Sequence, residues 1–219
     1  MTSSDACPPM ADRITKSLLG YGVIAGPVYV LSVAIQAVTR AGFDPLRHEA
    51  SLLANGDRGW IQILTFVLTG AMTIAAAVGI RRALDTGRTA NWAAVLLAGY
   101  GAGLVGAGVF RADPSMGFPP GAPAGRAPVS WHGMLHVLCA SIGFACLIAA
   151  CFVVAARFSR DGQRDWAWYS RLTGALFAGG FAAIASGSGS PVVVLFFTAV
   201  VVMAWVWLTA VSVKLYRSV

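Results

Sequence analysis

Three histidines and one aspartate are the residues best suited to chemistry in this sequence. His132 and His136 are four residues apart, so a helix would place both on one face. His48 and Asp113 lie in two other polar segments. Histidine transfers protons near neutral pH and binds metals, and aspartate serves as an acid, a base or a metal ligand. We therefore predict that His48, Asp113, His132 and His136 are catalytic residues that converge on one pocket.

Acid-initiated chemistry on an apolar chain suits this set of residues. A carboxyl group at Asp113, held near aromatic walls with a histidine bonding its second oxygen, would act as a strong general acid. Aromatic faces also stabilise carbocations, as the proton-initiated cyclisation of a prenyl chain by small membrane-bound terpene cyclases requires. This version needs no cofactor. Its predicted substrate contacts are Arg111, Trp60, Phe110, Phe118 and Trp131, with Arg111 or Arg126 holding a terminal polar or anionic group of the substrate.

A metal site is the alternative for the same residues. Histidine and aspartate are ordinary zinc ligands, so His132, His136, His48 and Asp113 would hold zinc or another divalent metal in a lipid hydrolase. The spacing of the two histidines is a weak signal by itself. Two further interpretations remain open: the histidines cap a helix and bond the loops without catalysis, or the chain is a non-catalytic transporter or accessory subunit.

The composition indicates which kind of protein must position these residues. Of 219 residues, 57% are hydrophobic and 11% are charged, against about 25% charged in an average soluble domain. So few charges cannot cover a soluble protein of this size, which excludes soluble enzymes and nucleic-acid-binding proteins in spite of the net charge of +7. We expect the partners to be membrane lipid and an apolar small molecule, and not nucleic acid.

Six apolar stretches are long enough for helices that cross a hydrocarbon core of about 30 Å. They cover residues 18–38, 60–80, 92–110, 133–155, 172–188 and 192–213. Because backbone groups in lipid must be satisfied within the chain, these spans are expected to be helices. The sequence predicts one all-α domain over residues 1–219, a six-transmembrane-helix bundle with a polar leader at 1–17 and outer loops at 39–59 and 111–131. The first span is expected to be retained and not cleaved as a signal peptide.

The distribution of charge predicts the orientation. Eleven Lys and Arg residues fall on the side of both termini, and five fall on the opposite side. Short cytoplasmic loops collect Lys and Arg, so both termini are expected in the cytoplasm, with the chain in the inner membrane and all three histidines outside. Within the spans lie neutral groups such as Gln36, Thr65 and Thr69, which favours an enzyme or a binding protein over an ion-coupled transporter.

Small residues at helical spacing predict close helix packing. Gly22 and Gly26 form a GxxxG pair, and Gly99 and Gly103 form another. Packing within the bundle is the simpler interpretation, and a homo-oligomer through these faces is the alternative.

Several motifs together resemble a known family. They are DPLRH at 44–48, GWIQ at 59–62, FRADP at 110–114, GFPPG at 117–121 and HGMLH at 132–136. This combination resembles the bacterial membrane family called domain of unknown function 998, over nearly the whole chain. The resemblance implies a six-helix membrane protein and, as the family name indicates, no particular reaction.

Overall fold

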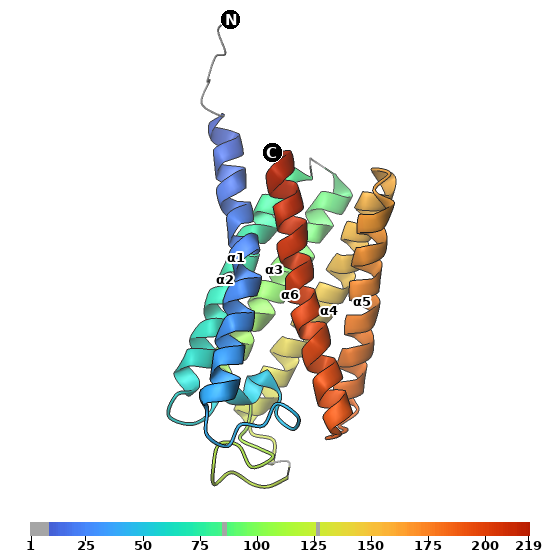
Figure 1. Cartoon of the computed structure of the whole chain (residues 1–219). Helices are drawn as coiled ribbons and strands as arrows, with labels where there is room; N and C mark the ends of the chain where they lie inside the picture. Colours follow the sequence, from blue (N-terminus) through green and yellow to red (C-terminus); the bar gives the residue numbers. More distant parts are fainter. Residues whose placement is uncertain (1–8, 85–86, 126–127) are drawn as a thin grey trace, which may run out of the picture.

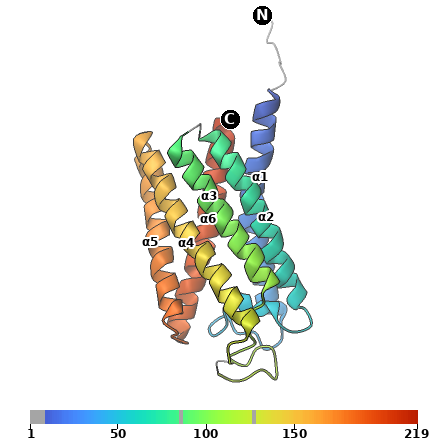
Figure 2. The same ribbon diagram turned by 180° about the vertical axis from the view of Figure 1, so that it is seen from behind.

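The computed structural model describes residues 9–84, 87–125 and 128–219. These residues form six α-helices and one 3-10 helix, in the order α1 (Met10–Thr39), η1 (Ala50–Ala54), α2 (Gly59–Ala83), α3 (Arg88–Val109), α4 (Trp131–Arg160), α5 (Arg164–Ala185) and α6 (Pro191–Ser218). The helices stand side by side in one bundle (Figure 1). The start of α1 and the end of α6 lie at one end, which we call the terminal end. The two long loops lie at the other, the loop end (Figures 1 and 2).

The expected all-helical membrane bundle is confirmed, with one difference in detail. Helices α1, α2, α3, α4 and α6 are long and apolar enough to cross a membrane. Helix α5 begins at Arg164, eight residues before the predicted span, and its first turns carry Arg164, Asp165 and Arg171. These charges lower its hydropathy, so α5 is not among the five candidate spans. It nevertheless packs along α4 and α6 (Figure 1).

Each helix packs against its neighbour in sequence, and α6 closes the ring against α1. Glycines permit the closest approaches. A Cβ atom at Gly26 would lie 2.9 Å from the carbonyl oxygen of Trp205 on α6, and one at Gly103 would lie 2.7 Å from the Cα of Gly143 on α4. Both GxxxG pairs therefore make close contacts within the bundle.

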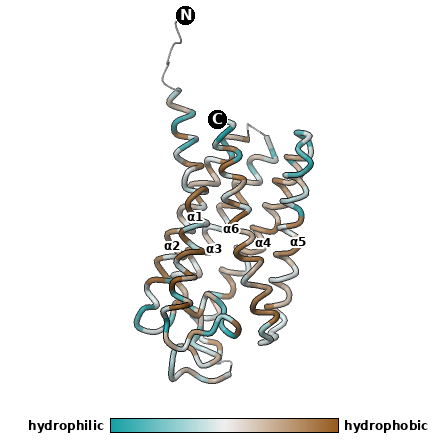
Figure 3. Tube along the Cα trace, viewed as in Figure 1, coloured by the Kyte–Doolittle hydropathy of each residue, from teal (hydrophilic) through white to brown (hydrophobic). Residues whose placement is uncertain are grey.

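Neutral polar residues join α1 to α2 inside the bundle. The side-chain nitrogen of Gln36 donates to the side-chain oxygen of Gln62 at 2.8 Å, and the hydroxyls of Ser32 and Thr65 share a hydrogen bond of 2.6 Å. Thr69 donates to the backbone of its own helix. Figure 3 shows the wider pattern, in which hydrophobic residues fill the middle of the helices and hydrophilic residues gather at the two ends. This is the distribution that a bilayer requires.

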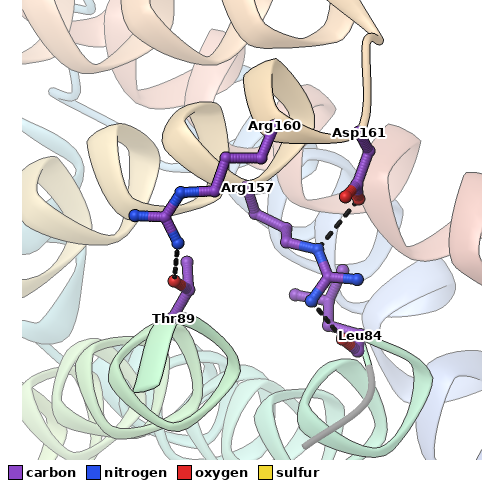
Figure 4. A network of polar contacts seen from close by, with 5 residues as sticks. All are labelled: Leu84, Thr89, Arg157, Arg160 and Asp161. Atoms are coloured by element: carbon purple, nitrogen blue, oxygen red, sulfur yellow. Dashed lines mark hydrogen bonds and ion pairs between the residues drawn. The ribbon is translucent and has the colours of Figure 1, made fainter. Parts of the chain in front are cut away.

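Arginines on α4 fasten the terminal end to the connection between α2 and α3. Arg157 donates from Nη1 to the backbone carbonyl of Leu84 at 2.6 Å and from Nε to the carboxylate of Asp161 at 2.8 Å (Figure 4). Arg160 donates to the hydroxyl of Thr89 at 2.8 Å (Figure 4). Since Leu84 follows the last residue of α2, its carbonyl has no partner in the helix and needs an outside donor.

We expect Arg157→Ala to lower the free energy of unfolding by about 1–3 kcal/mol, because it removes a charged donor from the Leu84 carbonyl. Arg160→Ala is the matched control, since it removes an exposed bond to a hydroxyl that water can replace. Thermal unfolding of the detergent-solubilised chain, followed by tryptophan fluorescence, measures both. Equal shifts for the two variants would contradict the role given to Arg157.

Arg40 organises the loop end. Its guanidinium donates to the carbonyls of Leu53 at 3.2 Å and Asn55 at 2.5 Å, and it lies 5.4 Å from the ring centroid of Phe118. Phe118 is fully buried against η1. Partial burial, followed by repulsion from Arg58, lowers the pKa of Arg40. Because both long loops meet at this arginine, they form one cover over the loop end of the bundle.

Candidate ligand-binding cavity

A cavity of about 530 Å³ lies in the loop-end half of the bundle. All six helices contribute to its walls, and η1 with residues 112–115 contributes to its roof. Most of the lining is alanine, valine, leucine and phenylalanine. The lining side chains that carry polar groups are Tyr29, His48, Glu49, Ser51, Tyr100, Asp113, Ser115, His136, Ser141 and Thr198. The volume falls within the range of about 300–1,000 Å³ that small-molecule sites occupy.

His136 is the cavity residue best placed for chemistry. It is buried near the start of α4, and its Nδ1 lies 3.0 Å from the carbonyl oxygen of Ala107 and 2.8 Å from that of Phe110. Both partners are acceptors, so Nδ1 carries the hydrogen and donates. The other nitrogen, Nε2, has no hydrogen-bond partner among the described residues and is an acceptor in the neutral ring. His136 therefore holds the end of α3 and leaves one lone pair for a ligand.

Asp113 also lines the cavity, but its carboxylate holds the start of α4. The backbone nitrogen of Ser130 donates to Oδ2 at 2.8 Å, and the Ser130 hydroxyl donates to Oδ1 at 2.5 Å. Ser130 Oγ in turn accepts from the backbone nitrogen of Gly133 at 3.0 Å, as the N-cap of the helix. Ser130 thus occupies the place that we predicted for a histidine on the second oxygen. A carboxylate here is also favoured by the dipole of α4.

Gly133 is required by this contact. A Cβ atom at position 133 would overlap Oδ2 of Asp113. We expect Gly133→Ala to displace Asp113 from Ser130 and to lower the free energy of unfolding by about 1–3 kcal/mol. Gly179→Ala is the control, because a Cβ atom there meets nothing within 4 Å and alanine favours the helix. Thermal unfolding of both variants tests the contact, and a Gly133→Ala protein as stable as wild type would contradict it.

His48 connects the two long loops. Its Nδ1 accepts from the backbone nitrogen of Asp44 at 2.8 Å, which leaves Nε2 to donate to the carbonyl of Met116 at 3.0 Å. The ring also packs against Phe43 and Phe118, with centroids 5.3 and 5.5 Å away. Both ring nitrogens are occupied, so His48 lies at the roof of the cavity as a structural link.

His132 does not join the other three residues at the cavity. It is exposed in the first turn of α4, and its ring stacks on Trp131 with centroids 3.6 Å apart. His136, one turn deeper, is covered by the end of α3. The predicted convergence therefore holds for His48, Asp113 and His136, and it is wrong for His132.

None of the five predicted substrate contacts is among the residues that line the cavity. Trp60 and Trp131 are 62% and 61% exposed, as expected of tryptophans that anchor at a membrane interface. Phe110 packs near Trp131, with ring centroids 6.5 Å apart, and Phe118 is buried under η1. Arg111 is exposed. This cavity is therefore not lined by the four aromatic residues that we predicted as its walls, Trp60, Phe110, Phe118 and Trp131. Arg126 lies outside the described residues.

The alternative metal site does not form. Among residues 9–84, 87–125 and 128–219, no group of three or more His, Cys, Asp or Glu side chains is arranged to hold a metal ion. The reason is local: His48 uses both nitrogens in the loops, and His132 lies outside the cavity.

Two tyrosines that we did not predict line the deeper part of the cavity. Tyr29 and Tyr100 are 6% and 3% exposed, and both pack on Trp205, with ring centroids 4.8 and 5.8 Å away. Tyrosine in a transmembrane helix usually lies at the interface. A tyrosine near the middle of a span is therefore the signal that could have identified them.

The sequence matches the family described as "Protein of unknown function (DUF998)" over residues 23–214. This range includes most of all six helices, so the chain belongs to that family, and the resemblance noted from the motifs is confirmed. No curated protein and no solved structure matches the chain. The family description assigns no reaction, so a function must be argued from the cavity.

Proposed function

We propose that this member of the DUF998 family binds an apolar, lipid-dissolved molecule in the loop-end cavity, with the polar part of that molecule at His136. The observation that carries the proposal is the cavity itself, about 530 Å³ of space inside a membrane bundle with a mostly apolar lining. A concave apolar site with a few converging polar groups is the usual form of a small-molecule site.

The lining is divided in a way that suits a molecule with a head and a tail. Helices α5 and α6 contribute Phe181, Ile184, Ala185, Phe197, Thr198, Val201 and Val202, of which Thr198 alone carries a polar group. The ionisable lining residues lie on α1, α3, α4 and the roof. A tail on the α5–α6 wall and a head on the opposite wall would satisfy both surfaces.

Extraction of the purified protein tests the proposal. The full chain is purified in mild detergent, treated with organic solvent, and the extract is analysed by mass spectrometry against an extract of the same membranes. The proposal expects one apolar species, enriched over its membrane abundance and close to one molecule per chain. An extract with the lipid composition of the bulk membrane would contradict it.

Proton transfer on the bound molecule is the second candidate function, and it rests on the free Nε2 of His136. This atom is able to accept a proton from the ligand while the carbonyls of Ala107 and Phe110 at Nδ1 stabilise the resulting positive charge. The prenyl cyclisation predicted from the sequence would need Asp113 as the proton donor. Since Ser130 donates to both oxygens of Asp113, we assign the acid–base role to His136 and an anchoring role to Asp113.

We further propose that the loop end faces away from the cytoplasm, in the inner membrane of a bacterium, because eleven Lys and Arg residues lie on the side of the termini and five on the loop side. The exposed positions Pro120 and Asp165 lie at opposite ends of the bundle. In a variant without the native cysteines, Pro120→Cys should react with a membrane-impermeant maleimide in intact cells, and Asp165→Cys should react after permeabilisation. The reverse pattern would contradict this orientation.

A further inference from the structure

The charges around the cavity limit what its ligand can be. No Lys or Arg is among the described residues that line the cavity, whereas Asp113 and Glu49 both line it. Among the described lining residues an anionic head group would find no cation to pair with and would lie beside the carboxylate of Asp113, which is costly away from water. Arg111, the predicted partner of an anionic group, is exposed elsewhere. This lining therefore disfavours an anionic ligand such as a prenyl phosphate or diphosphate.

Four aromatic rings line the cavity, and we call them the aromatic wall: His136, Phe66, Tyr29 and Tyr100. Phe66 lies between His136 and Tyr29, with its ring centroid 6.4 Å from that of His136 and 6.2 Å from that of Tyr29. Trp205 lies behind both tyrosines. A flat ring is the group that packs best on such a surface.

Polar atoms lie at two depths on the aromatic wall. At a rise of 1.5 Å per residue, His136 is about 8 Å along α4 from its start at Trp131. Tyr29 is about 15 Å along α1 from its end at Thr39, and Tyr100 is about 14 Å along α3 from its end at Val109. The backbone positions of the two tyrosines are therefore roughly 6–7 Å further from the loop ends of their helices than that of His136 is.

The hydroxyls of the deeper lining residues, Tyr29 and Tyr100, have no hydrogen-bond partners among the described residues. Buried polar groups are normally hydrogen-bonded, so unpaired ones beside a cavity indicate a ligand that supplies the missing atoms.

We infer that the ligand is a neutral lipid whose ring carries oxygen atoms on opposite edges, as in an alkylated or prenylated hydroquinone. One hydroxyl of the ring donates to Nε2 of His136, and the opposite oxygen bonds to the hydroxyls of Tyr29 and Tyr100. The tail lies along α5 and α6. This inference rests on the proposed function and adds the chemical class of the ligand.

Two probes that differ by one hydroxyl test the inference. Decylhydroquinone offers both oxygens, and meta-decylphenol offers one. Binding to the full chain in detergent is measured by calorimetry in oxygen-free buffer. We expect wild type to bind decylhydroquinone about fivefold to tenfold more tightly, the difference that one neutral hydrogen bond supplies. In Tyr29→Phe/Tyr100→Phe, which keeps both rings, the two probes should bind equally, at the wild-type affinity for the phenol.

The possible failures are distinguishable. A preference for the hydroquinone that persists in the double phenylalanine variant, or no preference in wild type, would overturn the inference and leave the apolar site in place. If neither probe binds wild type more tightly than it binds Ala140→Phe, in which a cavity-lining alanine is enlarged, the proposed function fails together with the inference. Thermal unfolding of each variant shows whether it is folded.

Discussion

Replacing Ala140 with phenylalanine should remove the co-purifying apolar molecule from the protein. Ala140 lies on α4 and lines the cavity, so the added ring enters the space that the molecule occupies. We expect the amount of bound molecule per chain to fall at least tenfold. The measurement is mass spectrometry of solvent extracts, normalised to protein.

Ala145→Phe is the matched control for this prediction. Ala145 lies on the same helix, five residues further along, and it is exposed on the outer surface of the bundle. The same ring there would meet lipid or detergent, and the bound molecule should be retained. Retention of the molecule at wild-type level in Ala140→Phe would show that the cavity is not its site.

Replacing His136 with asparagine should separate its two roles. The amide nitrogen of asparagine can take the place of Nδ1 and donate to the carbonyls of Ala107 and Phe110, but it offers nothing at the position of Nε2. We expect His136→Asn to unfold within a few degrees of wild type and to bind meta-decylphenol about tenfold more weakly, because the acceptor for the hydroxyl is lost.

His136→Ala is the comparison for this second prediction. It removes both nitrogens, so the end of α3 loses its donor and the free energy of unfolding should fall by about 2–4 kcal/mol through unpaired carbonyls and lost packing. Calorimetry and thermal unfolding are measured on the same preparations. If His136→Asn binds the phenol as wild type does, Nε2 is not a ligand contact and the acid–base role falls with it.

The fold could be predicted from composition and span length because a bilayer leaves the backbone few alternatives. Apolar runs such as 60–80 and 192–213 become helices, since unpaired backbone groups are costly in lipid. Helix α5 was less predictable. The apolar part of this helix is short, and charged first turns with Arg164 and Arg171 extend it toward the terminal end. Because charge content does not reveal where a helix begins, the sequence did not indicate this extension.

The site could be predicted in part. His48, Asp113 and His136 were placed on one side of the membrane by the order of spans and loops, and the structure brings all three to one cavity. Which way a helix faces depends on how its neighbours pack, and residue spacing does not contain this information. For that reason His132 was wrongly grouped with His136, and Tyr29 was missed.

Two motifs that were noted separately are the two halves of one contact. Arg111-Ala112-Asp113-Pro114 supplies the carboxylate, and His132-Gly133 supplies the position without a side chain against which that carboxylate lies. From the sequence alone, the two histidines of the second motif were predicted to be catalytic. In the structure, its glycine leaves room for the carboxylate of Asp113 at the start of α4.

Photo-crosslinking of a bound probe tests the central claim, that the cavity holds an apolar molecule, most directly. A meta-decylphenol with a diazirine in its tail is irradiated with the purified chain, and the labelled residues are mapped by peptide mass spectrometry. We predict labels on cavity-lining residues of α5 and α6, such as Phe181, Phe197 and Val201, and their loss in Ala140→Phe. Labels confined to outward-facing residues such as Val95 and Ile142, and unchanged in Ala140→Phe, would contradict the account.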